Sequence, residues 1–158
     1  MSKWFLLNFV LLIVIVWNVV GHYSFPRLPV HIVFGVIGAL IFLYNWTRNA
    51  VFETIRNVRS RKTKVALARF SRKVVTIHRW TGNIALLAIV IHGLLVISTY
   101  GFSLNNIKMV VGVLALIGLT LQILTGWLRL YKPTINLRYI HLYNGMMLFF
   151  LILVHILM

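Results

Sequence analysis

The sequence predicts an all-α integral membrane protein, a bundle of about five transmembrane helices forming a single domain over residues 1–158. Hydrophobic residues make up 61% of the chain, and the mean hydropathy is +0.94, values that exclude an ordinary soluble domain. The apolar residues fall into five runs, each long enough to cross a hydrocarbon core of about 30 Å as a helix. The basic residues that produce the formal net charge of +15 cluster between these runs. The charge therefore indicates membrane topology and not nucleic-acid binding.

The apolar runs alternate with polar connectors. The first run resembles a signal peptide, but no small-residue cleavage pattern follows it, so we interpret it as an uncleaved helix. A turn-rich segment at 21–29, broken by Pro26 and Pro29, separates it from the second run. The five spans are expected at residues 4–20, 30–46, 74–100, 107–128 and 139–158.

Basic residues concentrate in two connectors, 47–73 and 129–138, and a surface helix is expected at 65–70 in the first. This patch would suit an acidic partner or anionic lipid, but the positive-inside rule alone explains it, and we favour that explanation. With the amino terminus cytoplasmic and the carboxyl terminus outside, only Arg27 and Lys108 of the 16 basic residues face outward. We expect a multi-pass protein of the cell membrane, in a bacterial inner membrane.

Two histidine pairs repeat at one spacing, His78 and His92 in "HRWTGNIALLAIVIH" and His141 and His155 in "HLYNGMMLFFLILVH". Fourteen helical residues turn through about 1400°, nearly four turns, and rise about 21 Å. Each helix therefore carries two histidines on nearly one face, close to opposite membrane surfaces. The third and fifth spans run parallel, so His78 pairs with His141 and His92 with His155. The pattern predicts two stacked, bis-histidine haem b groups between these two helices.

Small and basic residues accompany the histidines. Gly82 and Gly145 each follow a histidine by four residues, on the same helix face, and would leave room for a flat macrocycle. Close helix packing explains them equally well. Arg79 and Arg138, with Lys132, would neutralise haem propionates at the inner surface, although positive-inside anchoring accounts for them too.

Other residues limit the chemistry. The chain has no cysteine, which excludes covalent haem attachment, iron–sulfur clusters and CxxC zinc sites. Glu53 is its sole acidic residue, which excludes hydrolysis by paired carboxylates, and no catalytic residue is predicted. Near the outer surface, His31 has the chemistry to contact a quinone, a metal substrate or a propionate, whereas we expect no dedicated role for His22.

The residues 78–92, the following span and "RYIHLYNGMMLFFLILVH" at 138–155 resemble the ferric reductase-like transmembrane domain family. That family includes NADPH oxidases, ferric reductases and the bacterial haem subunit of a periplasmic methionine sulfoxide reductase. The resemblance covers about half the chain. It implies electron transfer from a cytosolic donor to an outer acceptor, with His78 and His141 holding the inner haem and His92 and His155 the outer one.

The chain departs from this family because it lacks a sixth helix and a Gly-rich nucleotide motif, so it does not itself take hydride from NAD(P)H. The expected donor is separate: a cytosolic flavoprotein reductase, a bound flavin or a membrane quinol. The expected acceptor is ferric iron, oxygen or a periplasmic redox protein. Two alternatives stay open. One is a quinone-reducing di-haem cytochrome with inward electron flow, and the other is a haem-free membrane scaffold or transporter subunit.

Overall fold

Five helices build the chain in the computed structural model, which describes residues 3–23 and 27–158, apart from the side chains of Lys73 and Thr76. All five are long and apolar enough to cross a membrane, as the sequence predicted. Residues 24–26, including Pro26 of the expected turn, lie outside the described residues. The helices are α1 (Lys3–His22), α2 (Val30–Asn57), α3 (Arg61–Tyr100), α4 (Ile107–Tyr131) and α5 (Ile135–Leu157).

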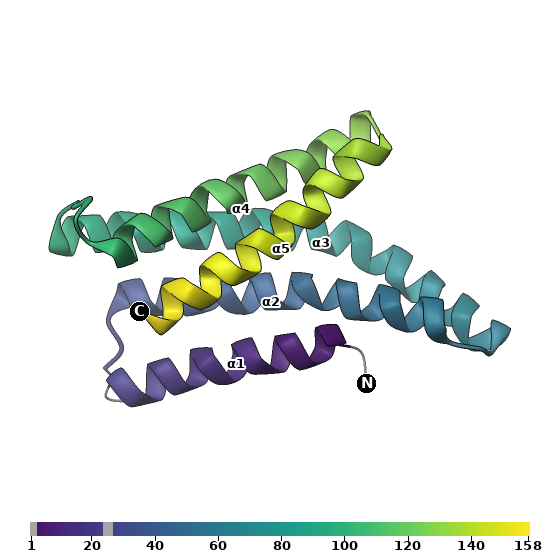
Figure 1. Ribbon diagram of the computed structural model, residues 1–158, viewed down its shortest axis with the longest axis horizontal. Coiled ribbons are helices and arrows are strands. Elements are labelled where there is room, and N and C mark those ends of the chain that lie inside the picture. The colour runs from purple at the N-terminus through teal and green to yellow at the C-terminus, as the bar shows by residue number, and fades with distance from the viewer. Residues whose placement is uncertain (1–2, 24–26) are drawn as a thin grey trace.

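The helices run alternately up and down, so α3 and α5 point the same way (Figure 1). Helix α3 packs against α2 and α4, while α5 packs against α4 and α1. Helix α1 also packs against α2. Across the described part of the chain, α3 and α5 make no extended backbone contact. The rings of His92 on α3 and His155 on α5 nevertheless lie close together.

An aromatic cluster holds α1, α2 and α5 together. The indole of Trp46 stacks on the ring of Phe149, with centroids 5.1 Å apart, and on Phe42 at 5.9 Å. Trp4 meets the edge of the same indole at 5.6 Å. The side chains of Leu11 and Leu148 beside this cluster are fully buried. Aromatic pairs of this kind add about 0.5–1.5 kcal/mol each to the burial of their area, so the cluster fixes one side of the bundle.

The basic connector at 47–73 is largely helical, and residues 65–70, expected as a surface helix, are part of the longer helix α3. Helix α2 continues to Asn57 and α3 begins at Arg61, so the connector is a helical hairpin with a loop of three residues. The segment contains no glycine or proline, and arginine and lysine are good helix formers. The Ser60 hydroxyl caps α3 by accepting a hydrogen bond from the Thr63 amide at 3.5 Å. We call residues 48–76 the basic hairpin.

The predicted ends of the other spans also shift. Helix α4 runs to Tyr131 and α5 starts at Ile135, so the connector expected at 129–138 shrinks to residues 132–134. Pro133 interrupts the helix there because it lacks an amide hydrogen. Thr134 caps α5 by accepting a hydrogen bond from the Leu137 amide. Helix α1 reaches His22, slightly beyond the expected end at residue 20.

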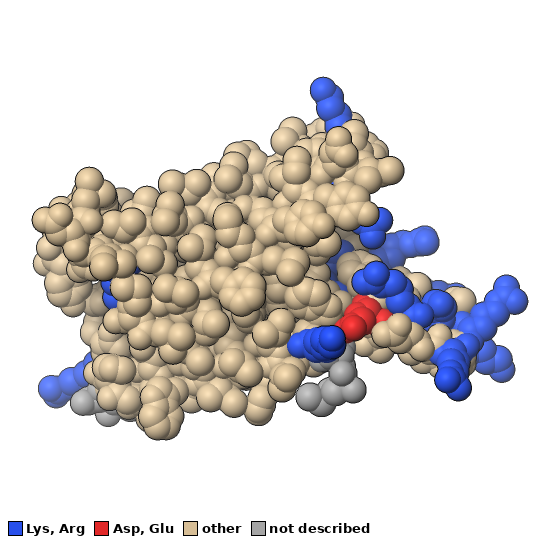
Figure 2. Space-filling view, viewed as in Figure 1, with Lys and Arg blue, Asp and Glu red and all other residues tan. Residues whose placement is uncertain are grey.

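The basic hairpin projects beyond the other helices at one end of the molecule (Figure 1). Lys and Arg side chains gather over this projection, whereas the surface of the bundle in this view is almost free of charge (Figure 2). Charged side chains are costly in a bilayer core. This distribution of charge suits a multi-pass membrane protein in which the uncharged part of the bundle crosses the membrane.

Thiol labelling tests this topology, because the native chain has no cysteine. Ala66→Cys in the hairpin and Leu104→Cys in the α3–α4 loop are both exposed positions. We expect a membrane-impermeant maleimide to label them from opposite sides of sealed vesicles, and both at the rate of a free peptide thiol. Ala85→Cys, at a site that is 1% exposed, is the protected control. Protection of the thiol at position 66 would mean that the hairpin lies in the membrane surface.

Candidate functional site

The outer histidines of α3 and α5 face each other. The ring centroids of His92 and His155 are 6.3 Å apart, and their planes are inclined by 88°. His92 Nδ1 lies 2.7 Å from the His31 carbonyl oxygen on α2. His155 Nδ1 lies 3.1 Å from the Lys108 carbonyl oxygen on α4. Both Nδ1 atoms must donate to these oxygens, so each Nε2 keeps a free lone pair.

The inner histidines also have Nδ1 close to an oxygen atom, but here the oxygen belongs to a side chain. His78 Nδ1 lies 2.9 Å from the Asn45 side-chain oxygen, which also accepts a hydrogen bond from the Thr81 hydroxyl at 2.7 Å. His141 Nδ1 lies 3.0 Å from the Thr125 hydroxyl oxygen. That hydroxyl donates to backbone carbonyls of its own helix, so it accepts from His141.

All four imidazoles are therefore held as the Nδ1–H tautomer, with Nε2 as the basic nitrogen. Histidines that bind metals are commonly oriented in this way, by donating the other ring hydrogen to a carbonyl or carboxylate. A metal between two imidazole nitrogens, each about 2.0–2.1 Å away, separates the two ring centroids by about 6 Å. The centroid separation of the outer pair, 6.3 Å, is of that size. Its residues fit a bis-histidine metal centre.

The acceptors on α2 share the spacing of the histidines. His31 and Asn45, which hold His92 and His78, are 14 residues apart, as are the two histidines themselves. Because α2 runs antiparallel to α3, His31 lies at the level of His92, and Asn45 lies at the level of His78. Sequence reasoning missed Asn45 and Thr125, although a search for polar residues at this spacing on neighbouring spans would have found Asn45.

Glycines press against the imidazoles from the neighbouring helices, and the sequence analysis did not single them out. A Cβ added to Gly35 would lie 2.9 Å from His92 Nδ1, and one added to Gly112 would lie 3.0 Å from His155 Cε1. Gly126 similarly approaches His141 Cε1 at 3.4 Å. Gly112 and Gly126 are again 14 residues apart. These glycines allow α2 and α4 to come close enough to fix the imidazole rings.

The two glycines that the sequence singled out lie elsewhere. A Cβ on Gly82 would meet only Ile123, at 3.9 Å, so this position has room beside it. One on Gly145 would lie 3.1 Å from the Gln122 amide nitrogen and 3.4 Å from Trp46. Their role beside a macrocycle stays a prediction.

Arginines surround the inner histidines. Arg48 on α2 and Arg129 on α4 both interact electrostatically with His78 and His141. The Nε atom of Arg48 is buried without a hydrogen-bond partner among the described residues, although its guanidinium stacks over Phe52 at 5.2 Å. An unpaired buried donor of this kind suits an anionic group bound beside it. Arg79, predicted for this role, is half-buried, whereas Arg138 is exposed.

The two remaining histidines differ in position. The His31 ring is centred 6.3 Å from that of His92 and 5.6 Å from that of Tyr100, so it belongs to the outer level. His22 contacts only its own helix among the described residues, through the Asn18 carbonyl. Sequence reasoning separated them in the same way.

The site consists of pairs, because no group of three or more metal-ligating side chains occurs among the described residues. Comparison with protein family models, curated proteins and solved structures found no match to this chain. Function is therefore inferred from the site itself. At one level the rings of His92 and His155 lie close together, and at the other His78 and His141 each have a hydrogen-bond partner on a neighbouring helix.

The tautomers give a direct test. In haem-free protein labelled with ¹⁵N-histidine, NMR should show His78, His92, His141 and His155 as Nδ1–H tautomers at neutral pH. Asn45→Leu should abolish this preference at His78 alone, since it removes the acceptor from one imidazole. Nε2–H tautomers at the outer pair in the native chain would contradict the assignment.

A matched pair of glycine substitutions tests the tight contacts. Alanine is favoured over glycine within helices by about 0.5–1 kcal/mol. Gly93→Ala, where an added Cβ meets nothing within 4 Å, should therefore keep or raise the free energy of unfolding in detergent. Gly112→Ala presses on His155 and should lower it by about 1–3 kcal/mol. Equal effects of the two substitutions would show that Gly112 is not tightly packed.

Proposed function

We propose that this protein is a di-haem b-type cytochrome that carries electrons across the membrane from an inner donor to an outer acceptor. The observation that carries the proposal is the common Nδ1–H tautomer of four imidazoles at two levels. A haem-free scaffold would also need acceptors for these imidazoles, but it would not need the repeated spacing of 14 residues that sets the histidines of α3 and α5 at two levels. The resemblance to the ferric reductase-like transmembrane domain family supports the same function.

Each of the two histidine pairs would bind one haem. His92 and His155 would hold the outer haem, and His78 and His141 the inner one. A bound haem supplies one-electron chemistry at its iron. With two imidazoles as its protein ligands, a bound haem would carry out electron transfer rather than oxygen binding. The spacing of 14 residues within α3 and within α5 corresponds to about 21 Å between the two levels, which divides the passage across the membrane into short steps.

Basic residues would orient the cofactors. Arg48, Arg79 and Arg129 lie at the inner level, where they would pair with the propionates of the inner haem. The buried Nε of Arg48 would gain the acceptor that it lacks. At the outer level, Lys108 and His31 are the nearest candidates. This distribution, with most cations at the inner surface, also supports a cytoplasmic amino terminus and an outer carboxyl terminus.

The basic hairpin supports a soluble donor over a membrane quinol. The apolar span of α3 begins at Ile77, and Arg61 precedes it by 16 residues, or about 24 Å of helix. Lipid headgroups extend only about 5–8 Å beyond the hydrocarbon on each side. The end of the hairpin therefore passes beyond the lipid, where its charges can meet a protein.

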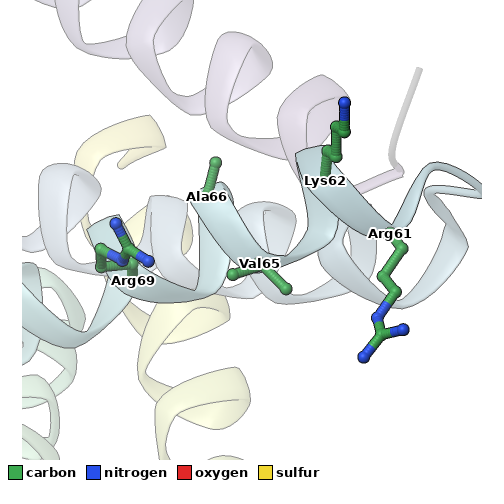
Figure 3. Close-up of a pocket in the computed structure, with 5 residues that line it drawn as sticks. All are labelled: Arg61, Lys62, Val65, Ala66 and Arg69. Atoms are coloured by element: carbon green, nitrogen blue, oxygen red, sulfur yellow. The ribbon is translucent and has the colours of Figure 1, made fainter.

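The surface near that end suits an acidic protein face. Arg61 and Lys62 point to opposite sides of α3, and small apolar side chains lie between them and Arg69 (Figure 3). Together they line a shallow hollow formed by Arg61, Lys62, Val65, Ala66 and Arg69. We propose a reduced flavoprotein with an acidic face as the donor. The outer acceptor is ferric iron, oxygen or a periplasmic redox protein.

Absorbance spectra of variants test the haem ligands. The reduced-minus-oxidised spectrum of purified native protein should show about two b haems per chain by pyridine haemochrome. His92→Ala should retain about one, because only the outer level loses a ligand, and His22→Ala should retain both. A native protein without haem after haem supplementation would overturn the proposed function.

Charge substitutions test the donor surface. With reduced flavodoxin as an acidic probe, Arg61→Gln/Lys62→Gln should slow haem reduction about 3–10-fold at low ionic strength, with a smaller effect at high salt. Arg27→Gln removes a charge from the opposite surface, at an exposed residue outside the proposed haem sites, and should change the rate little. Reduction by dithionite should be equal in all three proteins. Equal rates with flavodoxin would rule out docking on the hairpin.

A further inference from the structure

The two levels differ at the nitrogen that would bind iron. In the described part of the chain, the hydrogen bonds of His92 and His155 involve Nδ1 only. At the inner level, His141 Nε2 accepts a hydrogen bond from the side-chain amide of Gln122 at 3.1 Å. The outer pair is thus open to a metal, whereas one half of the inner pair is capped by the protein.

The cap is held in place by its own partners. The Gln122 side-chain oxygen accepts a hydrogen bond from the Asn144 amide at 2.7 Å, and Asn144 also donates to the Gly118 carbonyl at 2.9 Å. These bonds fix which end of the Gln122 amide faces His141. In a bilayer, a polar amide is stable only when it is hydrogen-bonded in this way.

Gly145 provides the room for this arrangement. An added Cβ there would lie 3.1 Å from the Gln122 amide nitrogen. The side chain of Gln122 therefore crosses from α4 to α5 between His141 and Gly145. The space beside Gly145, which the sequence predicted for a macrocycle, is taken by Gln122 in this structure. For the inner level to hold a haem, that side chain must move.

We propose that Gln122 is a latch on the inner haem site. Its amide competes with iron for His141 Nε2, so the outer site fills first and the inner site binds haem more weakly. The proposal rests on the proposed function, because it takes haem iron as the competitor. Gln122 is a positioning residue in this account, since it acts through His141.

Single-site backgrounds isolate the inner level. In full-length His92→Ala, haem titration reports the inner site alone, and adding Gln122→Ala should tighten its Kd about tenfold, the effect of removing a competing hydrogen bond. In full-length His78→Ala, only the outer site is intact, and the same addition should leave its Kd unchanged. Thr120→Ala is the matched control on α4, because its hydroxyl bonds only to its own helix among the described residues.

A second variant tests the latch independently, in case Gln122→Ala does not fold. Asn144→Leu keeps Gln122 but removes its anchor, and it should tighten inner haem binding in the same direction. An unchanged or weaker inner Kd in both variants would overturn the latch. So would a native protein whose two sites fill with equal affinity. Failure of every variant to bind haem would instead overturn the proposed function, and the latch with it.

Discussion

The structure depends on one interaction: in each of the four histidines of α3 and α5, Nδ1 lies within hydrogen-bond distance of an oxygen on a neighbouring helix. Within a bilayer there is no water to satisfy this donor, so an acceptor must come from a neighbouring helix. Helix α2 supplies acceptors to both histidines of α3, and α4 supplies them to both histidines of α5. These bonds fix the tautomer of each ring and the register of two antiparallel helix pairs at once.

The same interaction explains the glycines. An imidazole can reach an acceptor on the next helix only if the two backbones approach closely, as small residues allow in membranes. Gly35 and Gly112 give this approach at the outer level, and Gly126 at the inner one. At the outer level, this packing leaves the Nε2 atoms of His92 and His155 without a hydrogen bond among the described residues. Binding geometry is thus a consequence of how the bundle packs.

Much of this arrangement was predictable from the sequence. Five apolar runs gave the five helices, and the repeated spacing placed His92 opposite His155. The long helices of the basic hairpin were missed because hydropathy marks only the apolar part of a helix. The absence of glycine and proline from 47–73 was the available signal. Gln122 and Thr125 could not be assigned, because one sequence does not reveal which face of α4 meets α5.

The central claim is that the paired imidazoles bind iron through Nε2, and the planes of the outer pair offer its most direct test. Those planes are inclined by 88°, and His92 and His155 together would make a bound ferric haem low-spin, with a characteristic electron paramagnetic resonance spectrum. The account predicts this signal in the oxidised native protein and its loss in His155→Ala. A high-spin ferric signal in the native protein would contradict the account, since it would mean an iron without two imidazole ligands.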